Sequence, residues 1–287
     1  MVEALPVVAA IPNYNMADSL RRLLPQVLAQ HYDAVFVLDD ASTDHSFDVV
    51  GEFGNEVKFV RSRENRGAGA NRNQIIDQVG DRELIHFIDA DMDLGTVNTA
   101  AVARDVAARY ADRGVGLIGG LVSRADGIQE PHNYGAVFSL WGNITSGLPL
   151  IIDRLRAKPR LAKVVQRLAG PIMRDWPNIL EPPVAAPTYW IHEGNMLIYS
   201  SLLRSLGGYD PVMRSHEAQD LAIRLEKRGV KRQFDPSLRV LHHHIDVRGK
   251  NRNKWEYNAA LLSDSQAWNI SLADRPLVSL CYLVRFV

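Results

Sequence analysis

The chain has 287 residues, of which 46% are hydrophobic and 23% are charged, the composition of an ordinary globular protein. Lys plus Arg and Asp plus Glu number 33 each, which excludes a strongly basic protein that binds nucleic acid through its overall charge. The one cysteine, Cys281, excludes an internal disulfide and a cysteine-cluster metal site, and it favours a reducing, cytoplasmic location.

Two features of the chain bear on membranes. No apolar stretch approaches the roughly 20 residues needed to span a bilayer, and the N-terminus lacks the basic start of a signal peptide. Residues 276–287 are apolar but short, and we expect them to pack on the domain. The alternative is a C-terminal tail that makes a peripheral contact with a membrane or a partner.

Five short apolar runs alternate with four amphipathic segments in the first 120 residues. Several runs are continuous, which is typical of parallel strands covered on both faces. The segments between them have the pattern of helices, and Asp18 and Thr96 are suitable N-caps for the first and the last. This alternation predicts an α/β fold with a Rossmann-like, mostly parallel sheet flanked by helices. The predicted strands are residues 7–11, 34–38, 57–60, 84–88 and 115–118, and the predicted helices are residues 18–30, 46–53, 71–79 and 96–110.

The alternation stops after Gly120. Residues 121–190 hold aromatic and amphipathic stretches and then a Pro-rich segment, which predicts a helical insertion followed by an ordered loop. Beyond it we expect a strand over 189–199, a helix over 216–228 that Gly229 ends, a short strand over 238–242 and a polar helix over 254–268.

Four of the predicted strands end in polar motifs. Ligands of open α/β sheets bind beyond the carboxyl ends of the strands, so these motifs contain the candidate functional residues. They are Pro12-Asn13-Tyr14-Asn15, the segment 39–44 (DDASTD), the segment 64–73 (ENRGAGANRN) and Asp89-Ala90-Asp91-Met92-Asp93.

The fourth motif places three alternating aspartates after a buried run. Clustered carboxylates repel one another, and a hard divalent cation removes that repulsion while it bridges to diphosphate oxygens. The alternative is helix capping ahead of Thr96. The spacing also matches an EF-hand loop, but Leu94 stands where that loop needs Gly and Ala100 where it needs Glu.

Two further classes of nucleotide-binding protein do not match. The chain has no G-x-x-x-x-G-K-[ST] loop, which excludes a P-loop NTPase. Gly67-Ala68-Gly69 matches part of the dinucleotide fingerprint, but Arg72 stands at its third position and the motif follows the third strand. A nicotinamide enzyme is therefore not favoured.

The motifs together resemble family 2 glycosyltransferases, the nucleotide-diphospho-sugar transferases of the A-type glycosyltransferase fold. The resemblance implies a catalytic domain over residues 1–250, with a nucleotide-binding half (1–120), the helical insertion (121–190) and an acceptor-side elaboration (191–250), before a C-terminal helical tail (251–287). The matching residues, in the family's order, are Pro12, Tyr14 and Asn15, the segments 39–44, 65–67 and 72–73, Asp89 and Asp91, Gly194-Asn195-Met196, Gly207-Gly208-Tyr209-Asp210 and the segment 217–224 (EAQDLAIR).

For the donor, the resemblance implies that Pro12, Tyr14 and Asp40 hold the nucleotide base and that Arg72 approaches the diphosphate. The alternatives are a core aromatic for Tyr14 and a solvent-facing helix residue for Arg72. The residues expected at the donor are Pro12, Tyr14, Asn15, Asp40, Arg72, Asp89 and Ala90.

For the metal, the resemblance makes Asp89 and Asp91 the family's D-x-D pair, with Asp91 as the direct ligand of Mn²⁺ or Mg²⁺. The cation would act as a Lewis acid on the departing diphosphate. A later histidine is a further expected ligand, and His242 and His244 share one face of an extended segment while His243 lies on the other. The alternative is that these are partly buried strand histidines.

The acid-bearing helix departs from the family pattern. Relatives carry Glu-Asp-x-Asp-Leu, whose first Asp is the usual general base, but Ala218 stands at that position here. Inversion needs a carboxylate within hydrogen-bond reach of the acceptor hydroxyl, so Glu217 is the expected substitute, with Asp220 and His216 as fallbacks. Ala218 would also be compatible with an acceptor that needs little deprotonation, or with impaired catalysis.

The sequence therefore predicts an inverting, metal-dependent glycosyltransferase that takes a nucleotide-sugar donor, a UDP-sugar by default. The acceptor, a carbohydrate, a lipid-linked molecule or a small molecule, is expected between the Glu217 helix and the insertion. There Trp141, Trp176 and Trp190 either stack on sugars or fill the core. A catalytically impaired nucleotide-sugar or carbohydrate-binding relative is the alternative that Ala218 motivates. A sugar nucleotidyltransferase is not favoured, because no Gly-rich loop with Arg and Lys follows the first strand.

Overall fold

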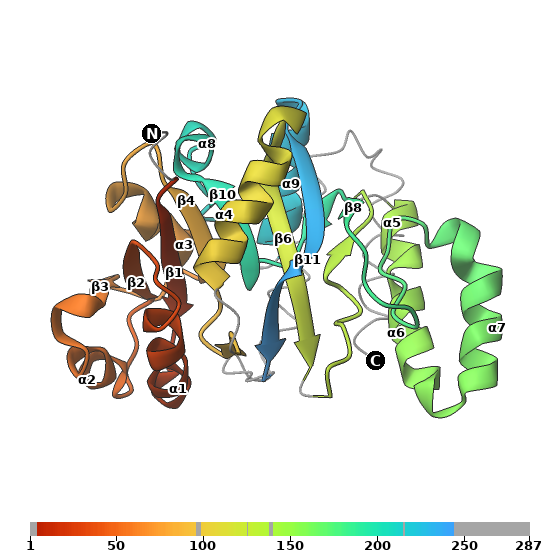
Figure 1. The fold of residues 1–287 in the computed structure, drawn as a ribbon, viewed down its shortest axis with the longest axis horizontal. Helices are drawn as coiled ribbons and strands as arrows, with labels where there is room; N and C mark the ends of the chain where they lie inside the picture. Colours follow the sequence, from red (N-terminus) through yellow and green to blue (C-terminus); the bar gives the residue numbers. More distant parts are fainter. Residues whose placement is uncertain (1–4, 96–98, 125, 138–139, 215, 244–287) are drawn as a thin grey trace.

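A twisted sheet lies at the centre of the molecule, with helices against both of its faces (Figure 1). The computed structural model describes residues 5–95, 99–124, 126–137, 140–214 and 216–243. Across the sheet the strands follow the order β3-β2-β1-β4-β10-β6-β11-β5, and β8 pairs with β11. The strands are β1 (Val7–Asn13), β2 (Ala34–Asp39), β3 (Lys58–Arg61), β4 (Leu84–Ile88), β5 (Met92–Asp93), β6 (Val115–Arg124), β8 (Ala186–Pro187), β10 (Asn195–Tyr199) and β11 (Lys231–His242).

The first half of the sheet is parallel, as predicted. β3, β2, β1 and β4 run in one direction, β10 is antiparallel to its neighbours β4 and β6, and β11 is parallel to β6. A second, two-stranded sheet pairs β7 (Tyr134–Gly135) with β9 (Trp190–Ile191). The predicted fold class, an α/β fold with a mostly parallel sheet flanked by helices, is confirmed.

The helices form two layers because alternate side chains of the buried strands point to opposite faces. On one face, β1 side chains such as Ile11 pack against α1 (Ala17–Leu28) and α2 (Ser46–Gly51), and Val7 packs against α4 (Thr99–Tyr110). On the other face, Val8 and Ala10 share a core with the 3₁₀ turn Asn73–Asp77 after α3 (Ala68–Arg72), with α8 (Ser200–Ser205) and with α9 (Glu217–Lys227).

The predicted helical insertion is present beside the sheet. It comprises α5 (Leu140–Thr145), α6 (Gly147–Arg154) and α7 (Pro159–Ala169), and its small core contains Ile152, Trp176 and Trp190. Figure 1 shows α7 at the edge of the molecule, farther from the sheet than α5 and α6. Within the described ranges, no helix is long and apolar enough to cross a bilayer.

Four sequence-based boundaries were wrong. The strand expected over 115–118 extends to Arg124 as β6. The strand expected over 189–199 is two strands, β9 and β10, separated by a turn at residues 192–194. The short strand expected over 238–242 is the end of the long strand β11, whose pairing with β6 shifts register between Asp235 and Arg239. The helix expected over 71–79 begins earlier, at Ala68, and continues past Arg72 as a 3₁₀ turn.

The predicted N-cap at Asp18 was also wrong. Met16 occupies the cap position of α1, and Asp18 lies in the first turn, where its charge complements the helix dipole. Asp44, from the loop after β2, instead accepts a hydrogen bond from the Ala17 N–H at 2.9 Å. Thr96, His244, the polar helix over 254–268 and the C-terminal tail lie outside the described residues.

Candidate active site

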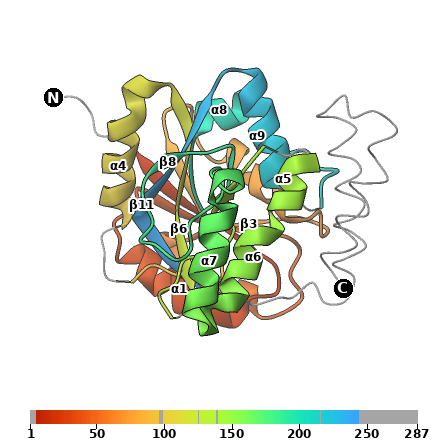
Figure 2. The ribbon, with the colours of Figure 1, turned by 90° about the vertical axis from the view of Figure 1, so that its right-hand side faces the viewer.

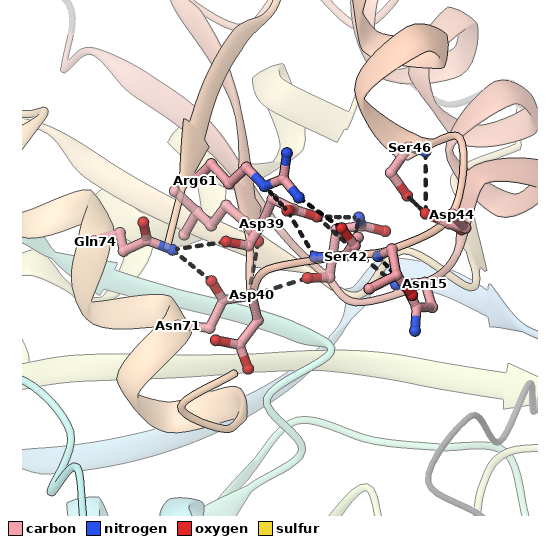
Figure 3. A network of polar contacts seen from close by, with 12 residues as sticks. Asn15, Asp39, Asp40, Ser42, Asp44, Ser46, Arg61, Asn71 and Gln74 are labelled. Atoms are coloured by element: carbon pink, nitrogen blue, oxygen red, sulfur yellow. Dashed lines mark hydrogen bonds and ion pairs between the residues drawn. The ribbon is translucent and has the colours of Figure 1, made fainter. Parts of the chain in front are cut away.

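A buried polar network joins the carboxyl ends of β1 and β2 (Figure 3). Asn13 Nδ2 donates to Asp39 Oδ1 at 2.8 Å and to Ser42 Oγ at 3.1 Å, and the Ser42 N–H donates to Asp39 Oδ2 at 3.0 Å. Asn15, with φ of 53°, donates its N–H to Ser42 Oγ, and its Oδ1 accepts from the Thr43 N–H at 2.7 Å. Asn15 therefore positions the two strand-end loops beside the half-buried Pro12 and Tyr14.

Asp40 organises the turn that leads into α3. Its side chain is buried, and its two carboxylate oxygens accept the backbone N–H groups of Arg66 and Gly67, each at 2.8 Å. Burial raises the pKa of this carboxyl. Gly67 has φ of 89°, a conformation that favours glycine. A hydrogen bond from the ring N–H of a nucleotide base to Asp40 stays a prediction, and in the protein both carboxylate oxygens already accept backbone N–H groups.

Arg72 is a buried cation, so the alternative of a solvent-facing helix residue was wrong. Its Nη2 lies 2.6 Å from Asp89 Oδ1, and its Nη1 lies 3.8 Å from Glu193 Oε2. The guanidinium also lies over the rings of Phe87 and Tyr209, at 5.9 and 6.0 Å from their centroids. Arg72 thus fixes the orientation of Asp89, and its approach to a diphosphate stays a prediction.

Asp89 lies at the end of β4 against an unusually close backbone. Its N–H donates to the Gly194 carbonyl at 3.3 Å. A Cβ added at Gly194 would lie 2.8 Å from Asp89 Oδ2 and 2.5 Å from Met92 Cε, so only glycine fits without displacing them. Ala90 is buried below this turn, in the core with α1.

Asp91 and His242 form the pair that best matches a metal site. Asp91 Oδ2 and His242 Nε2 lie 3.1 Å apart, although the two residues are 151 positions apart in the sequence. Adjacent ligands at ~2.1 Å from an octahedral Mg²⁺-like ion are separated by ~3.0 Å, so this pair could hold one such ion without moving apart. Burial lowers the pKa of His242, but hydrogen bonds to Asp91 and Glu130 outweigh it and raise that pKa to about 9.

The pair is not a complete metal site. In the part of the chain that the structure describes, no group of three or more His, Cys, Asp or Glu side chains is gathered around a point that could hold an ion. Glu130 Oε1 lies 3.6 Å from His242 Nδ1, on the other side of the ring. The arrangement suits an ion that takes its remaining ligands from water and substrate, as Mg²⁺-like ions commonly do.

Asp93, the third aspartate of the motif, has a structural role. Its Oδ1 accepts from Arg22 Nε at 3.0 Å and from Gln26 Nε2 at 2.9 Å, which ties β5 to α1. Its Oδ2 lies 2.6 Å from His243 Nε2. His242, at the end of β11, and His243, the residue after it, therefore contact different aspartates, as alternation along an extended segment predicts.

The two predicted catalytic carboxylates differ in their surroundings. Glu217, the first residue of α9, is buried with its Cγ against Gly69 of α3. Asp220 Oδ2 accepts a hydrogen bond from Arg224 Nε at 2.9 Å and forms an ion pair with Arg224 Nη2 at 2.7 Å, so its charge is already neutralised. Of the two, Glu217 is the better candidate for a base. Ala218 is half-buried and packs on the core of the insertion.

Sequence reasoning missed Glu193, which the structure places between Arg72 and Glu217. It lies in the turn between β9 and β10 with its side chain 14% exposed, and it hydrogen-bonds to the Tyr209 side chain. Within the described residues its Oε1 has no hydrogen-bond partner. Burial, together with the charges of Glu217 and Asp89, raises the pKa of Glu193 to about 7, against the opposing effect of Arg72. Gly194 could have indicated it, because a glycine inside the stretch 189–199, which was predicted as one strand, favours a turn at this position.

The tryptophans of the predicted acceptor region have two different environments. Trp176 and Trp190 are buried with their ring centroids 6.0 Å apart, so they fill the core of the insertion. Trp141, on α5, is 58% exposed, and it lines a cavity of about 200 Å³ together with Thr145 and Ile172. Only Trp141 of the three is placed to contact a ligand at the surface.

Comparisons with known proteins bear on the fold and on the segment that holds the strand-end motifs. The family model "Glycosyl transferase family 2" matches residues 8–94, which hold all four strand-end motifs. No curated protein sequence matches the chain closely enough to be counted as a relative.

Solved structures of similar fold are glycosyltransferases. One is the mannosyltransferase PcManGT from Pyrobaculum calidifontis in complex with GDP-Man and Mn2+, with 19% identity, 98% of this chain and 70% of that chain covered, and a TM-score of 0.58. Another is S. aureus TarS 1–349 in complex with UDP, with 14% identity, 98% and 71% covered, and a TM-score of 0.55. GalNAc-T7 with UDP, GalNAc and Mn2+ has 14% identity, 98% and 55% covered, and a TM-score of 0.59.

The fold and the strand-end motifs agree with these comparisons. Residues 8–94 match the glycosyl transferase family 2 model, and the whole fold is similar to that of solved glycosyltransferase structures.

Proposed function

We propose that this protein is an inverting, metal-dependent glycosyltransferase that uses a nucleoside diphosphate sugar as its donor. The observation that carries the proposal is the Asp91–His242 pair, whose ligand atoms lie 3.1 Å apart beside Asp89 at the end of β4. The solved structures of similar fold support it, since two of them contain Mn2+ and all three contain a nucleotide or nucleotide sugar. A UDP-sugar is the default donor, and GDP-sugars are the next to test.

The donor would extend along the carboxyl ends of β1, β2 and β4. Tyr14 and the turn held by Asp40 would contact the nucleoside. Asp91 and His242, with Asp89 beside them, would hold Mn²⁺ or Mg²⁺. The bound ion would act as a Lewis acid towards the diphosphate leaving group. Arg72 holds Asp89 in place through its contact with Asp89 Oδ1, and it supplies a buried positive charge next to that carboxylate.

The acceptor hydroxyl would reach the site from the side of α9. Glu217 is the proposed base, and Glu193 is the second candidate because its unpartnered oxygen and a pKa of about 7 suit proton transfer near neutral pH. A binding protein without catalysis is the alternative, and Ala218 favours it because this side chain packs on the insertion and supplies no carboxylate.

A thermal-shift panel of nucleoside diphosphates and sugar nucleotides, with and without Mn²⁺, tests the donor site. A ligand that binds only the folded state at 100 times its Kd adds about 2.7 kcal/mol to the free energy of unfolding, so the melting temperature should rise for one nucleoside and mainly with Mn²⁺. Asp91→Asn should remove the Mn²⁺-dependent part of the rise in melting temperature. Asp48 is an exposed aspartate on α2, and Asp48→Asn should leave that rise unchanged. An unchanged melting temperature across the panel would refute the donor site.

A further inference from the structure

The helical insertion carries an exposed apolar surface that the donor site does not use. Leu161, Val164 and Leu168 of α7 are 45%, 53% and 77% exposed, and Ile172 follows them just beyond the helix. At 100° per residue these three α7 side chains fall within a 60° arc, next to the buried arc that holds Ala162 and Ala169. They form a continuous strip, here named the apolar ridge (Leu161, Val164, Leu168 and Ile172), that points away from the insertion's own core.

Positive charge borders the apolar ridge. Arg160, Lys163 and Arg167 of α7 are exposed, and their helical angles place them directly beside the ridge, on the side opposite the buried arc. Between Leu155 and Arg174 the chain has no Asp or Glu, and its basic residues are Arg156, Lys158, Arg160, Lys163, Arg167 and Arg174. Two aspartates flank this stretch: Asp153 is already bound by Arg124 and Arg156, and Asp175 pairs with Arg174, so Arg160, Lys163 and Arg167 beside the ridge are not neutralised by either of them. The surface is therefore both apolar and locally basic in a protein whose total charge is balanced.

The location of α7 suits contact with a flat partner. Figure 2 shows α7 on the side that faces the viewer, in front of α6, and in Figure 1 the same helix lies at the edge of the molecule. The exposed Trp141 and Ile144 of α5 extend the apolar surface of the insertion, and Trp141 also lines the 200 Å³ cavity beside Ile172. An exposed apolar strip with cationic flanks is the pattern of a helix that lies in the interface of a membrane.

We propose that α7 docks the protein on an anionic lipid bilayer, with the apolar ridge inserted among the acyl chains and Arg160, Lys163 and Arg167 at the lipid phosphates. Charge decides this partner: a second copy of the same surface would bring two basic stretches together, whereas anionic headgroups neutralise them. Trp141, at the mouth of the cavity, would lie close to the bilayer, where an aromatic ring is stable in the headgroup region. This proposal does not depend on the identity of the donor.

Co-sedimentation of the full chain with vesicles tests the proposal. The protein should bind vesicles made of equal parts phosphatidylglycerol and phosphatidylcholine, and binding should weaken as salt rises. Vesicles of phosphatidylcholine alone should bind it far less. Replacement of Arg160, Lys163 and Arg167 by Gln should weaken binding to the anionic vesicles about a hundredfold, since each basic residue near the surface contributes about a fivefold factor.

A second variant tests insertion of the ridge. Val164→Gln with Leu168→Gln keeps good helix formers on an exposed face and should weaken binding at least about tenfold. Matched controls are Phe47→Gln, an exposed apolar residue on α2, and the triple replacement of Arg82, Lys227 and Lys231 by Gln, which removes the same charge elsewhere. Both controls should bind like the wild type, and all variants should keep its melting temperature.

Three results of the vesicle experiments would overturn the proposal. They are equal binding by wild type and both α7 variants, binding to uncharged vesicles that salt does not weaken, and no binding to any vesicle. If Val164→Gln with Leu168→Gln instead converted a dimer into a monomer in size-exclusion chromatography, a second copy of the chain would be the occupant of the ridge, and the membrane proposal would also fail.

Discussion

Two glutamates are the proposed candidates for the base that would activate an acceptor. Glu217 lies at the first turn of α9 and Glu193 lies in the turn before β10. With Ala218 at the family's usual base position, we expect Glu217→Gln to lower turnover roughly 10²–10⁴-fold, because a positioned base typically contributes that much. Donor binding, measured by the thermal shift with Mn²⁺, should persist. Glu56→Gln, exposed on the turn after α2, is the matched control. Near-normal turnover of Glu217→Gln would transfer the role to Glu193.

Ionisation of Glu193 should be visible in the pH dependence of turnover. Its carboxyl has a pKa raised to about 7, so it is protonated below that pH and charged above it. We expect turnover to rise between pH 6 and 8 as Glu193 ionises beside Glu217, and Glu193→Gln to remove this step. The measurement is a pH–rate profile of both proteins under single-turnover conditions. The same step in the Glu193→Gln profile would show that another group titrates there.

At the scale of elements, a buried hydrogen-bonded chain ties β4 to β10 and to the turn after α1. Tyr32 Oη lies 2.8 Å from His86 Nδ1, and His86 Nε2 lies 2.8 Å from Asn195 Oδ1. Asn195 Nδ2 donates to the Leu121 and Leu238 carbonyls, so its Oδ1 must accept from His86. His86 therefore carries its proton on Nε2 and accepts from Tyr32, and the neutral ring is the form that fits.

The Tyr32–His86–Asn195 hydrogen bonds predict that the free energy of unfolding falls in acid. Burial lowers the pKa of His86 to about 4, below its ordinary 6.5, so the unfolded chain takes up a proton first as the pH falls. The free energy of unfolding should drop by up to about 3 kcal/mol between pH 6.5 and 4 from this residue. Urea unfolding at several pH values should show a shallower slope for His86→Gln than for wild type or for the exposed His45→Gln. Equal slopes for the His86 variant and the wild type would contradict the assignment.

The sequence predicts a strand or helix well when neighbouring residues alone determine where it begins and ends. The runs at 34–38 and 84–88 were placed within a residue, because continuous apolar stretches bounded by turn residues specify buried strands locally. The division of 189–199 depends on Gly194, whose backbone must pass close to Asp89, and the extension of β11 depends on a register shift against β6. Both are tertiary constraints that no short window of sequence contains. For the same reason Glu193 was missed, while Asp91 was singled out by the alternating aspartates after a buried run, and His242 only through the family pattern.

For the whole molecule, the central question is whether the fold needs the metal. Asp91 and His242 already bond to each other, and His243 and Asp93 do the same beside them. We therefore expect EDTA to leave the melting temperature of the ligand-free protein unchanged while it abolishes stabilisation by a nucleoside diphosphate. Differential scanning calorimetry with and without EDTA measures both effects. A lower melting temperature of the ligand-free protein in EDTA would mean that the ion is part of the folded structure.

The path of the chain through the sheet also sets the order in which the site can be assembled. Asp89 and Asp91 leave the ribosome long before His242, which lies at the end of β11, and β11 must pair with both β6 and β5 to bring its histidine to them. A nascent polypeptide that has emerged only as far as α9 thus has the carboxylates without their imidazole partner. The proposed cation would consequently bind at this pair only late in biosynthesis, in chains that have already closed their sheet.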